Sequence, residues 1–241
     1  MNKHELLQII DDFKDIYKTT SIENEYIVIE RIEKIIDEYL KNNPYDTEIW
    51  ILQALLVYES PLNDLMKTIN CLKKVLIFDP NNTTAALFLG YVYEYSSYIP
   101  EDFFHKLLNI KSDNNEIASM IEFVKYFYYR YKENNELIEQ TLLQSIALCS
   151  NHVWNNIKLD QFYLQNKQID KAKDYIFQGF NNIQYVYHKE DFKQNFKYNP
   201  FDIEEFFNER IKGTHLSWVN YDSIKETFDY ICELYFAPER T

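Results

Sequence analysis

The residues with the clearest chemical potential are a cysteine and a histidine at the predicted junction of two helices. Cys149-Ser150-Asn151-His152 places a thiol three positions before an imidazole, and such a pair can act as nucleophile and general base. Cys149 also ends an apolar stripe, and Ser150 or Asn151 is a suitable cap for the next helix. Because residue types alone do not make a site without the matching geometry, we favour the helix-junction interpretation over catalysis.

Other sequence motifs for chemistry are missing. The chain contains neither GxGxxG nor GxxxxGK[ST], the patterns that cradle phosphates, and it lacks the HExxH zinc motif. Glu190 and Asp191 follow His188 closely, but their spacing matches no metal motif. The five histidines are isolated from one another in the sequence: His4, His105, His152, His188 and His215. We therefore expect a protein that is not an enzyme and uses no cofactor or metal ion.

The cysteines and the start of the chain bear on the compartment. Cys71, Cys149 and Cys232 are odd in number and far apart, and no CxxC is present. This favours free thiols in a reducing compartment over a disulfide framework. The first residues carry acidic side chains without a long apolar core, and no apolar run approaches the roughly 18 residues that span a bilayer. We expect a cytoplasmic protein without a signal peptide or a membrane segment.

The net charge of −13 is concentrated at the two ends of the chain. Residues 1–60 hold 6 basic and 13 acidic side chains, residues 61–200 hold 15 and 16, and residues 201–241 hold 4 and 9. Such a chain repels nucleic acids and anionic membranes and attracts basic proteins. We therefore predict a basic protein partner, with no nucleic acid and no membrane. The alternative is that the acidity only keeps the protein soluble.

The elements around these residues repeat with a step of 36 between residues 44 and 100. Pro44 recurs as Pro80, and the small residue Ala54 recurs as Gly90. One helical hairpin cannot bury its own apolar face, so a recurring hairpin predicts a stack in which neighbours bury it for each other. The chain has only 3 glycines, which favours an all-α fold because strand turns and phosphate loops need more of them.

This pattern resembles the tetratricopeptide repeat (TPR) family over about 60 residues. The family pairs two antiparallel helices, with a Leu-Gly and a later Tyr in the first helix and a Pro closing the second. The matching residues are Leu89, Gly90, Tyr93 and Pro80, with Trp50 and Ala54 one step earlier. The resemblance implies an α-α superhelix, a TPR-like solenoid of antiparallel helix pairs. Its step here is 36 residues rather than the usual 34.

Apolar residues at helical spacing predict the other elements. Helices are expected over 3–18, 22–40, 47–59, 62–78, 83–97, 103–110, 116–132, 135–149, 152–165 and 169–187, and then over 201–211 and 220–236. Residues 188–200 have no clear period and are interpreted as a connection. We accordingly predict a helical repeat array over 1–190 and a C-terminal helical cap over 191–241, because a solenoid must shield its last apolar face. A separate binding element in the C-terminal part is the alternative.

The resemblance also implies where a partner would bind. In TPR-like proteins the inner faces of the first helices form a concave surface. On that basis the partner-binding residues are expected to be Glu48, Tyr58, Tyr91, Glu94 and Tyr95, with Tyr98 and Tyr128 nearby. Tyrosine is a good anchor because it presents a large area with few rotamers to fix. The alternative is that most of these rings belong to the core.

Two functions fit these expectations. The first is a non-enzymatic interaction module, a scaffold or adaptor that binds another protein. The second is a bacterial immunity protein that neutralises a co-encoded toxin, because an acidic chain suits the basic cleft of a nuclease toxin. An enzyme with an unrecognised site and an RNA-binding helical repeat are disfavoured by the missing motifs and by the charge. The sequence leaves the partner and the oligomeric state open.

Overall fold

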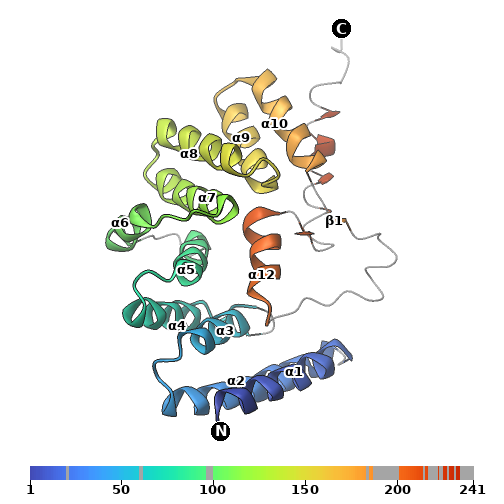
Figure 1. Ribbon diagram of the computed structural model, residues 1–241. Helices are drawn as coiled ribbons and strands as arrows, with labels where there is room; N and C mark the ends of the chain where they lie inside the picture. Colours follow the sequence, from blue (N-terminus) through green and yellow to red (C-terminus); the bar gives the residue numbers. More distant parts are fainter. Residues whose placement is uncertain are drawn as a thin grey trace. The chain divides into compact units, whose positions relative to one another are not determined.

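Figure 1 shows the computed structural model of the chain. Its internal contacts divide it into two compact units. The described residues are 1–19, 22–59, 62–95, 100–182, 185–186, 201–213 and 215–216, with single positions or short runs between 222 and 233. The first unit comprises Met1–Tyr93 and Lys197–Ile203, and the second comprises Glu94–Phe196 and Glu204–Thr241. The chain changes from one unit to the other after Tyr93, Phe196 and Ile203. The division into a repeat array over 1–190 and a cap over 191–241 stays a prediction.

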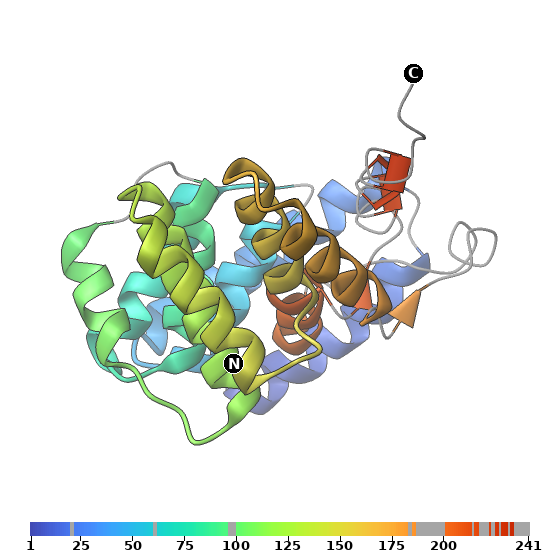
Figure 2. The ribbon, with the colours of Figure 1, turned by 90° about the horizontal axis from the view of Figure 1, so that it is seen from above.

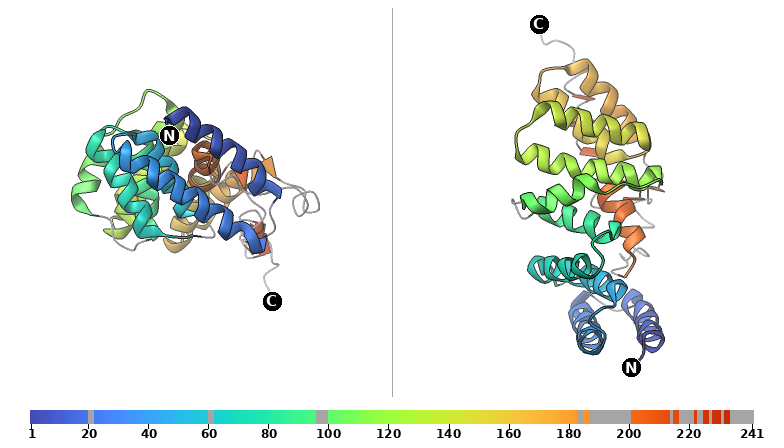
Figure 3. Two further views of the ribbon diagram at one scale, coloured as in Figure 1. Left: turned by 90° about the horizontal axis from the view of Figure 1, so that it is seen from below. Right: turned by 60° about the vertical axis from the view of Figure 1, so that its left-hand side comes forward.

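The first unit consists of helices in successive hairpins. Its helices are α1 (Lys3–Thr19), α2 (Ile22–Asn42), α3 (Thr47–Tyr58), α4 (Leu65–Phe78) and α5 (Thr83–Tyr95), of which the last two residues belong to the second unit. Along the chain α1 packs on α2, α2 on α3 and α3 on α4, and the α1–α2 hairpin is plain in Figure 3. The all-α class is thereby confirmed for this part.

Side-chain caps set where these helices begin. Asp64 accepts the backbone N–H of Lys67 at 2.9 Å, and Asn82 accepts that of Ala85 at 2.9 Å. Each satisfies one of the amide groups that the first turn of a helix leaves unpaired. The helix predicted from residue 62 therefore begins only at Leu65, after its cap.

The repeated small residue lies at a close helix crossing. Ala54 on α3 is fully buried, and the hydroxyl of Thr68 on α4 donates to its carbonyl oxygen at 3.5 Å. A larger side chain at this position would push α4 away from α3. Ala54 therefore lies where the two helices of this hairpin come close together.

The second unit continues the hairpin pattern, as Figure 2 shows for α7 with α8 and α9 with α10. Its elements are α6 (Glu101–Asn109), α7 (Asn115–Tyr131), α8 (Asn135–Leu148), α9 (Val153–Gln165), α10 (Ile169–Asn181), β1 (Tyr185–Val186), the part of α12 (Ile203–Phe206) after Ile203, the π-helical turn η1 (Phe207–Lys212) and β2 (His215–Leu216). The strands β1 and β2 pair in parallel, with Tyr185 opposite His215. Here the predicted helix 169–187 was too long, because α10 ends at Asn181.

The predicted C-terminal helices are described only in part. The first, over 201–211, is observed as α12 followed by η1. Most of the second, over 220–236, lies outside the described residues, but Phe228 stacks on Phe180 of α10 with ring centroids 4.3 Å apart. It also meets Phe177 edge-on. This contact covers part of the last hairpin, and the cap over 191–241 stays a prediction.

A buried polar network ties η1 to α9 within the second unit. The Nε2–H of His152 donates to the carbonyl of Ile211 at 2.6 Å, so its Nδ1 accepts from the Ser119 hydroxyl at 2.9 Å. His152 is fully buried, and burial lowers its pKa to about 3. The indole of Trp154 donates to the carbonyl of Glu209 at 3.0 Å. Both carbonyls belong to the last turn of a helix, where intrahelical partners are missing.

The turn η1 ends at a glycine that fits closely against Trp154. Gly213 has a φ of +71°, in the left-handed region, and a Cβ built on it would lie 2.9 Å from two atoms of the indole ring. Any other residue would meet backbone strain and a steric clash together. Only glycine satisfies both constraints at this position.

We expect Gly213→Ala to lower the free energy of unfolding by about 1–3 kcal/mol, because it adds strain at a positive φ and a clash with Trp154. Denaturant titration would measure the loss. In a Trp154→Phe background the smaller ring relieves the clash, so the cost of Gly213→Ala should be lower there. An unchanged midpoint for Gly213→Ala would mean that η1 does not dock on α9.

Asp160 on α9 is a second buried titratable group in this unit. It is fully buried, neither of its carboxylate oxygens has a hydrogen-bond partner among the described residues, and burial raises its pKa to about 7. The native state therefore holds this proton more tightly than the unfolded chain, whose aspartate pKa is about 3.9. The stabilising contribution of protonated Asp160 is present below pH ~4 and is lost as the pH rises towards 7.

We expect Asp160→Asn to remove this loss, so that the variant becomes more stable than the parent as the pH rises from 4 to 7. The difference should grow by up to about 1.4 kcal/mol per pH unit. His152 acts in the opposite sense, because its lowered pKa costs stability as the pH falls below 6.5. In the parent protein the two effects oppose each other between pH 4 and 6.5. In Asp160→Asn only the effect of His152 remains, so the free energy of unfolding of the variant should rise over this range. Parallel curves for the two proteins would contradict the burial of an ionisable carboxyl group at this position.

Candidate functional site

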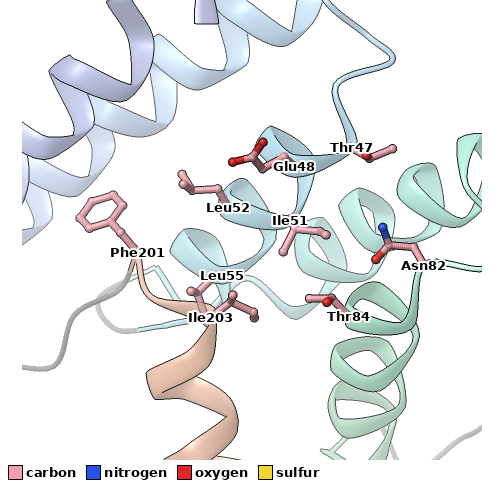
Figure 4. Close-up of a pocket in the computed structure, with 9 residues that line it drawn as sticks. All are labelled: Thr47, Glu48, Ile51, Leu52, Leu55, Asn82, Thr84, Phe201 and Ile203. Atoms are coloured by element: carbon pink, nitrogen blue, oxygen red, sulfur yellow. The ribbon is translucent and has the colours of Figure 1, made fainter. Parts of the chain in front are cut away.

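The first unit contains a pocket of about 400 Å³ along one face of α3 (Figure 4). This volume lies within the range of ligand pockets, about 300–1,000 Å³. Thr47, Ile51 and Leu55 are four residues apart, so one face of α3 forms a wall of the pocket. The remaining lining residues are Glu48 and Leu52 from α3, Asn82 and Thr84 from the start of α5, and Phe201 and Ile203 from the C-terminal part of the unit.

The lining suits binding rather than chemistry. Leucine, isoleucine and phenylalanine side chains make up the apolar part, and Phe201 is only 7% exposed. Threonine hydroxyls and an asparagine amide supply the polar groups, and Glu48 is the ionisable residue among the nine that line the pocket. A nucleophile beside a general base is not found among these residues. The pocket therefore offers an apolar surface with a few polar groups at its margin, the usual composition of a binding site.

A lysine at the start of α1 pairs with the acidic side chain at the margin of the pocket. Lys3 Nζ lies 2.6 Å from Glu48 Oε2 and 3.0 Å from Asp46 Oδ1. Burial acts to lower the pKa of Lys3, but its hydrogen bonds to the two carboxylates outweigh burial and raise it. The side chain of Glu48 is 68% exposed, so this ion pair contributes little stability and leaves the carboxylate open to another cation.

Part of the acidic surface of the first unit is already engaged in structure. Lys67 of α4 lies 2.6 Å from a carboxylate oxygen of Glu33 and 2.9 Å from one of Asp37, both on α2. Burial acts to lower the pKa of Lys67, but its hydrogen bonds to the two acids raise it. These two acidic residues therefore hold α2 and α4 together, whereas Glu48 faces the pocket.

The structure places three of the seven predicted binding residues in the first unit. Glu48 lines the pocket. The ring of Tyr58 contacts that of Tyr91 edge-on, with centroids 6.2 Å apart, and also packs on Phe88. Tyr91 is only 5% exposed and so belongs to the core of this unit. The structure thus brings Tyr58 and Tyr91 together, and neither lines the pocket with Glu48.

Three more of these residues belong to the second unit. Glu94 forms an ion pair with Arg130 of α7. Tyr95 is 58% exposed at the end of α5, and Tyr128 stacks on Phe104 of α6 with ring centroids 3.4 Å apart. Tyr98 lies outside the described residues. The assignment of all seven residues to partner binding stays a prediction.

Most of the residues that line the pocket were not predicted from the sequence. Ile51 and Leu52 follow Glu48 at helical spacing, and that signal was available but pointed equally to a core helix. Phe201 and Ile203 come from a segment more than a hundred residues away. No local pattern indicates their contact with α3, so only the tertiary structure reveals it.

The cysteine and histidine considered for catalysis are engaged separately. Cys149 donates to the side-chain oxygen of Asn151 at 2.8 Å, and burial raises the pKa of its thiol. His152 bonds to Ser119 and Ile211 through its two ring nitrogens. The imidazole is thus occupied inside the fold, which agrees with the helix-junction interpretation.

Within the described part of the chain, no helix is long and apolar enough to cross a membrane.

Comparisons with known proteins bear on the fold. No family model matches the sequence, and no curated protein matches it. Among solved structures, the chain is similar to the crystal structure of PilW, described as a widely conserved type IV pilus biogenesis factor, with 14% identity and a TM-score of 0.52. The match covers 90% of this chain and 94% of PilW. At this identity the likeness shows the fold alone, and the chain therefore has an all-helical repeat fold, consistent with a TPR-like arrangement.

Proposed function

We propose that the chain is a non-enzymatic protein-interaction module, a scaffold or adaptor, and that it binds a partner with a basic surface through the α3 pocket. The observation that carries this proposal is the pocket itself, an apolar recess with the exposed carboxylate of Glu48 at its margin. Such a recess accepts an apolar anchor of a partner, and the carboxylate favours a cation beside that anchor.

The charge of the first unit supports a basic partner. Its residues include 10 basic and 16 acidic side chains, a net charge of −6. A field of this sign accelerates the encounter with a positive surface and opposes the approach of nucleic acids. The all-helical repeat fold supports a binding role in the same way, because stacked hairpins present extended surfaces.

An immunity protein is the second candidate function. The net charge of −13 divides nearly evenly, with −6 in the first unit and −7 in the second. An inhibitor of a basic toxin, such as a nuclease, would present this kind of charge to the cleft that it blocks. A toxin-like reading frame next to this gene, lethal only when this chain is absent, would favour this function over a scaffold.

We expect Leu52→Arg to abolish partner capture from a lysate of the native organism, because it places a cation inside an apolar recess. The affinity for the partner, once identified, should fall by more than about tenfold. Met66→Arg is the matched control, since Met66 lies on α4, is 67% exposed and does not line the pocket. Equal capture by both variants, each folded by circular dichroism, would place the binding surface elsewhere.

We also expect salt to slow association with the purified partner. If long-range attraction drives the encounter, the association rate should drop by about tenfold or more between low salt and about 0.5 M, where the Debye length is only a few ångströms. Stopped-flow fluorescence measures this rate directly. A rate that stays constant or rises with salt would leave the acidic side chains as solubilising groups.

A further inference from the structure

In the second unit, the faces of α7 and α9 already hold a segment of the chain itself. The turn η1 packs on both helices, and Ile211 is fully buried there. Lys212, the next residue, lies 3.3 Å from a carboxylate oxygen of Glu116 on α7. The start of α9 supplies the hydrogen-bond donors His152 and Trp154 for two backbone carbonyls. This face therefore holds an apolar side chain, the basic side chain after it and the backbone around them.

The α3 pocket offers a bound segment the same three kinds of group as the face of α7 and α9. These are an acidic side chain, a pair of polar side chains at the start of a helix and an apolar wall. Glu48 is the second residue of α3 as Glu116 is the second residue of α7, and their side chains are 68% and 57% exposed. Asn82 and Thr84 precede and follow the first residue of α5, as His152 and Trp154 do on α9. The apolar wall consists of Ile51, Leu52 and Leu55.

We infer that the α3 pocket binds a segment of a partner protein in which an apolar side chain is followed directly by a lysine or arginine, in the manner of Ile211 and Lys212 on α7 and α9. The apolar side chain enters between Leu55 and Phe201, and the cation pairs with Glu48. This inference rests on the proposed function and defines the partner's binding motif.

The polar groups of the pocket can meet this ligand. The hydroxyl of Thr84 can donate to a carbonyl of the bound segment, as the indole of Trp154 does in the second unit. Lys3 pairs with both Glu48 and Asp46. When the cation of a bound segment pairs with Glu48, Lys3 can therefore remain paired with Asp46. The excess of 16 acidic over 10 basic side chains in this unit favours the basic residue of the motif further.

The test uses three labelled peptides and the full chain. The first peptide has the sequence of residues 206–214, the second carries Ile211→Ser, and the third carries Lys212→Glu. Fluorescence anisotropy at low salt should show binding of the first peptide and at least about tenfold weaker binding of the other two. Glu48→Gln in the protein should weaken the first peptide severalfold and leave the Lys212→Glu peptide unchanged or tighter. Glu38→Gln, an equal charge change on the exposed surface of α2, should have no effect.

The outcomes separate this inference from the proposed function. Peptide binding that ignores Glu48→Gln and Leu52→Arg but responds to Glu116→Gln would mean exchange with the resident turn η1, and would overturn the inference. A native partner that is captured through Leu52 while all three peptides bind equally, or none binds, would overturn the motif and leave the protein-binding function standing. Loss of partner capture together with loss of peptide binding in Leu52→Arg supports both.

Discussion

The structure depends on one constraint, which is that a helical hairpin has more apolar surface than it can bury alone. Each hairpin must therefore find a neighbour. In the first unit α2 packs on α3, and in the second α8 packs on α9, so consecutive hairpins cover one another. Where a face has no such neighbour, something else must cover it, and the two units meet this requirement differently.

In the second unit the covering element is the turn η1, and it is held by polar as well as apolar contacts. Ile211 and Phe206 are fully buried, and the side chains of His152, just before α9, and of Trp154 on α9 satisfy carbonyls at the end of the turn. A buried polar group that lacks a partner costs about 1–3 kcal/mol, so the bonds from His152 and Trp154 specify where η1 lies. In the first unit Phe201 and Ile203 reach α3 but leave a pocket beside it. A surface of this kind is available to another protein.

Much of the fold could be predicted from the sequence because its signals are local. The apolar spacing of each helix and the prolines Pro44 and Pro80 between helices act within a few residues of their position, and this local pattern repeats with a step of 36. The candidate site was harder, because helical spacing does not distinguish a ring in the core from a ring at the surface. Tyr91 and Tyr95 are four residues apart on α5, yet Tyr91 is 5% exposed and Tyr95 is 58% exposed.

Long-range contacts account for the rest. The contact of Ile211 with His152 and that of Phe201 with α3 join segments that share no sequence pattern. The strand pair formed by Tyr185 and His215 is equally invisible, since two residues are too few to show an alternation. Glu48 was predicted because the family resemblance implies that the inner face of a first helix binds the partner, and the structure places it at the pocket. Its neighbours Ile51 and Leu52 were not predicted, because their helical spacing suits a core helix equally well.

The central claim is that the face of α3 next to Glu48 is where a partner binds. Hydrogen exchange measured by mass spectrometry, on the full chain with and without its bound protein partner, tests this claim most directly. The account predicts that amides in residues 47–55 and at the start of α5 exchange more slowly in the complex, because the first turn of a helix leaves its N–H groups without intrahelical partners. Protection confined to α7, α9 or other parts of the second unit, with α3 unchanged, would contradict it.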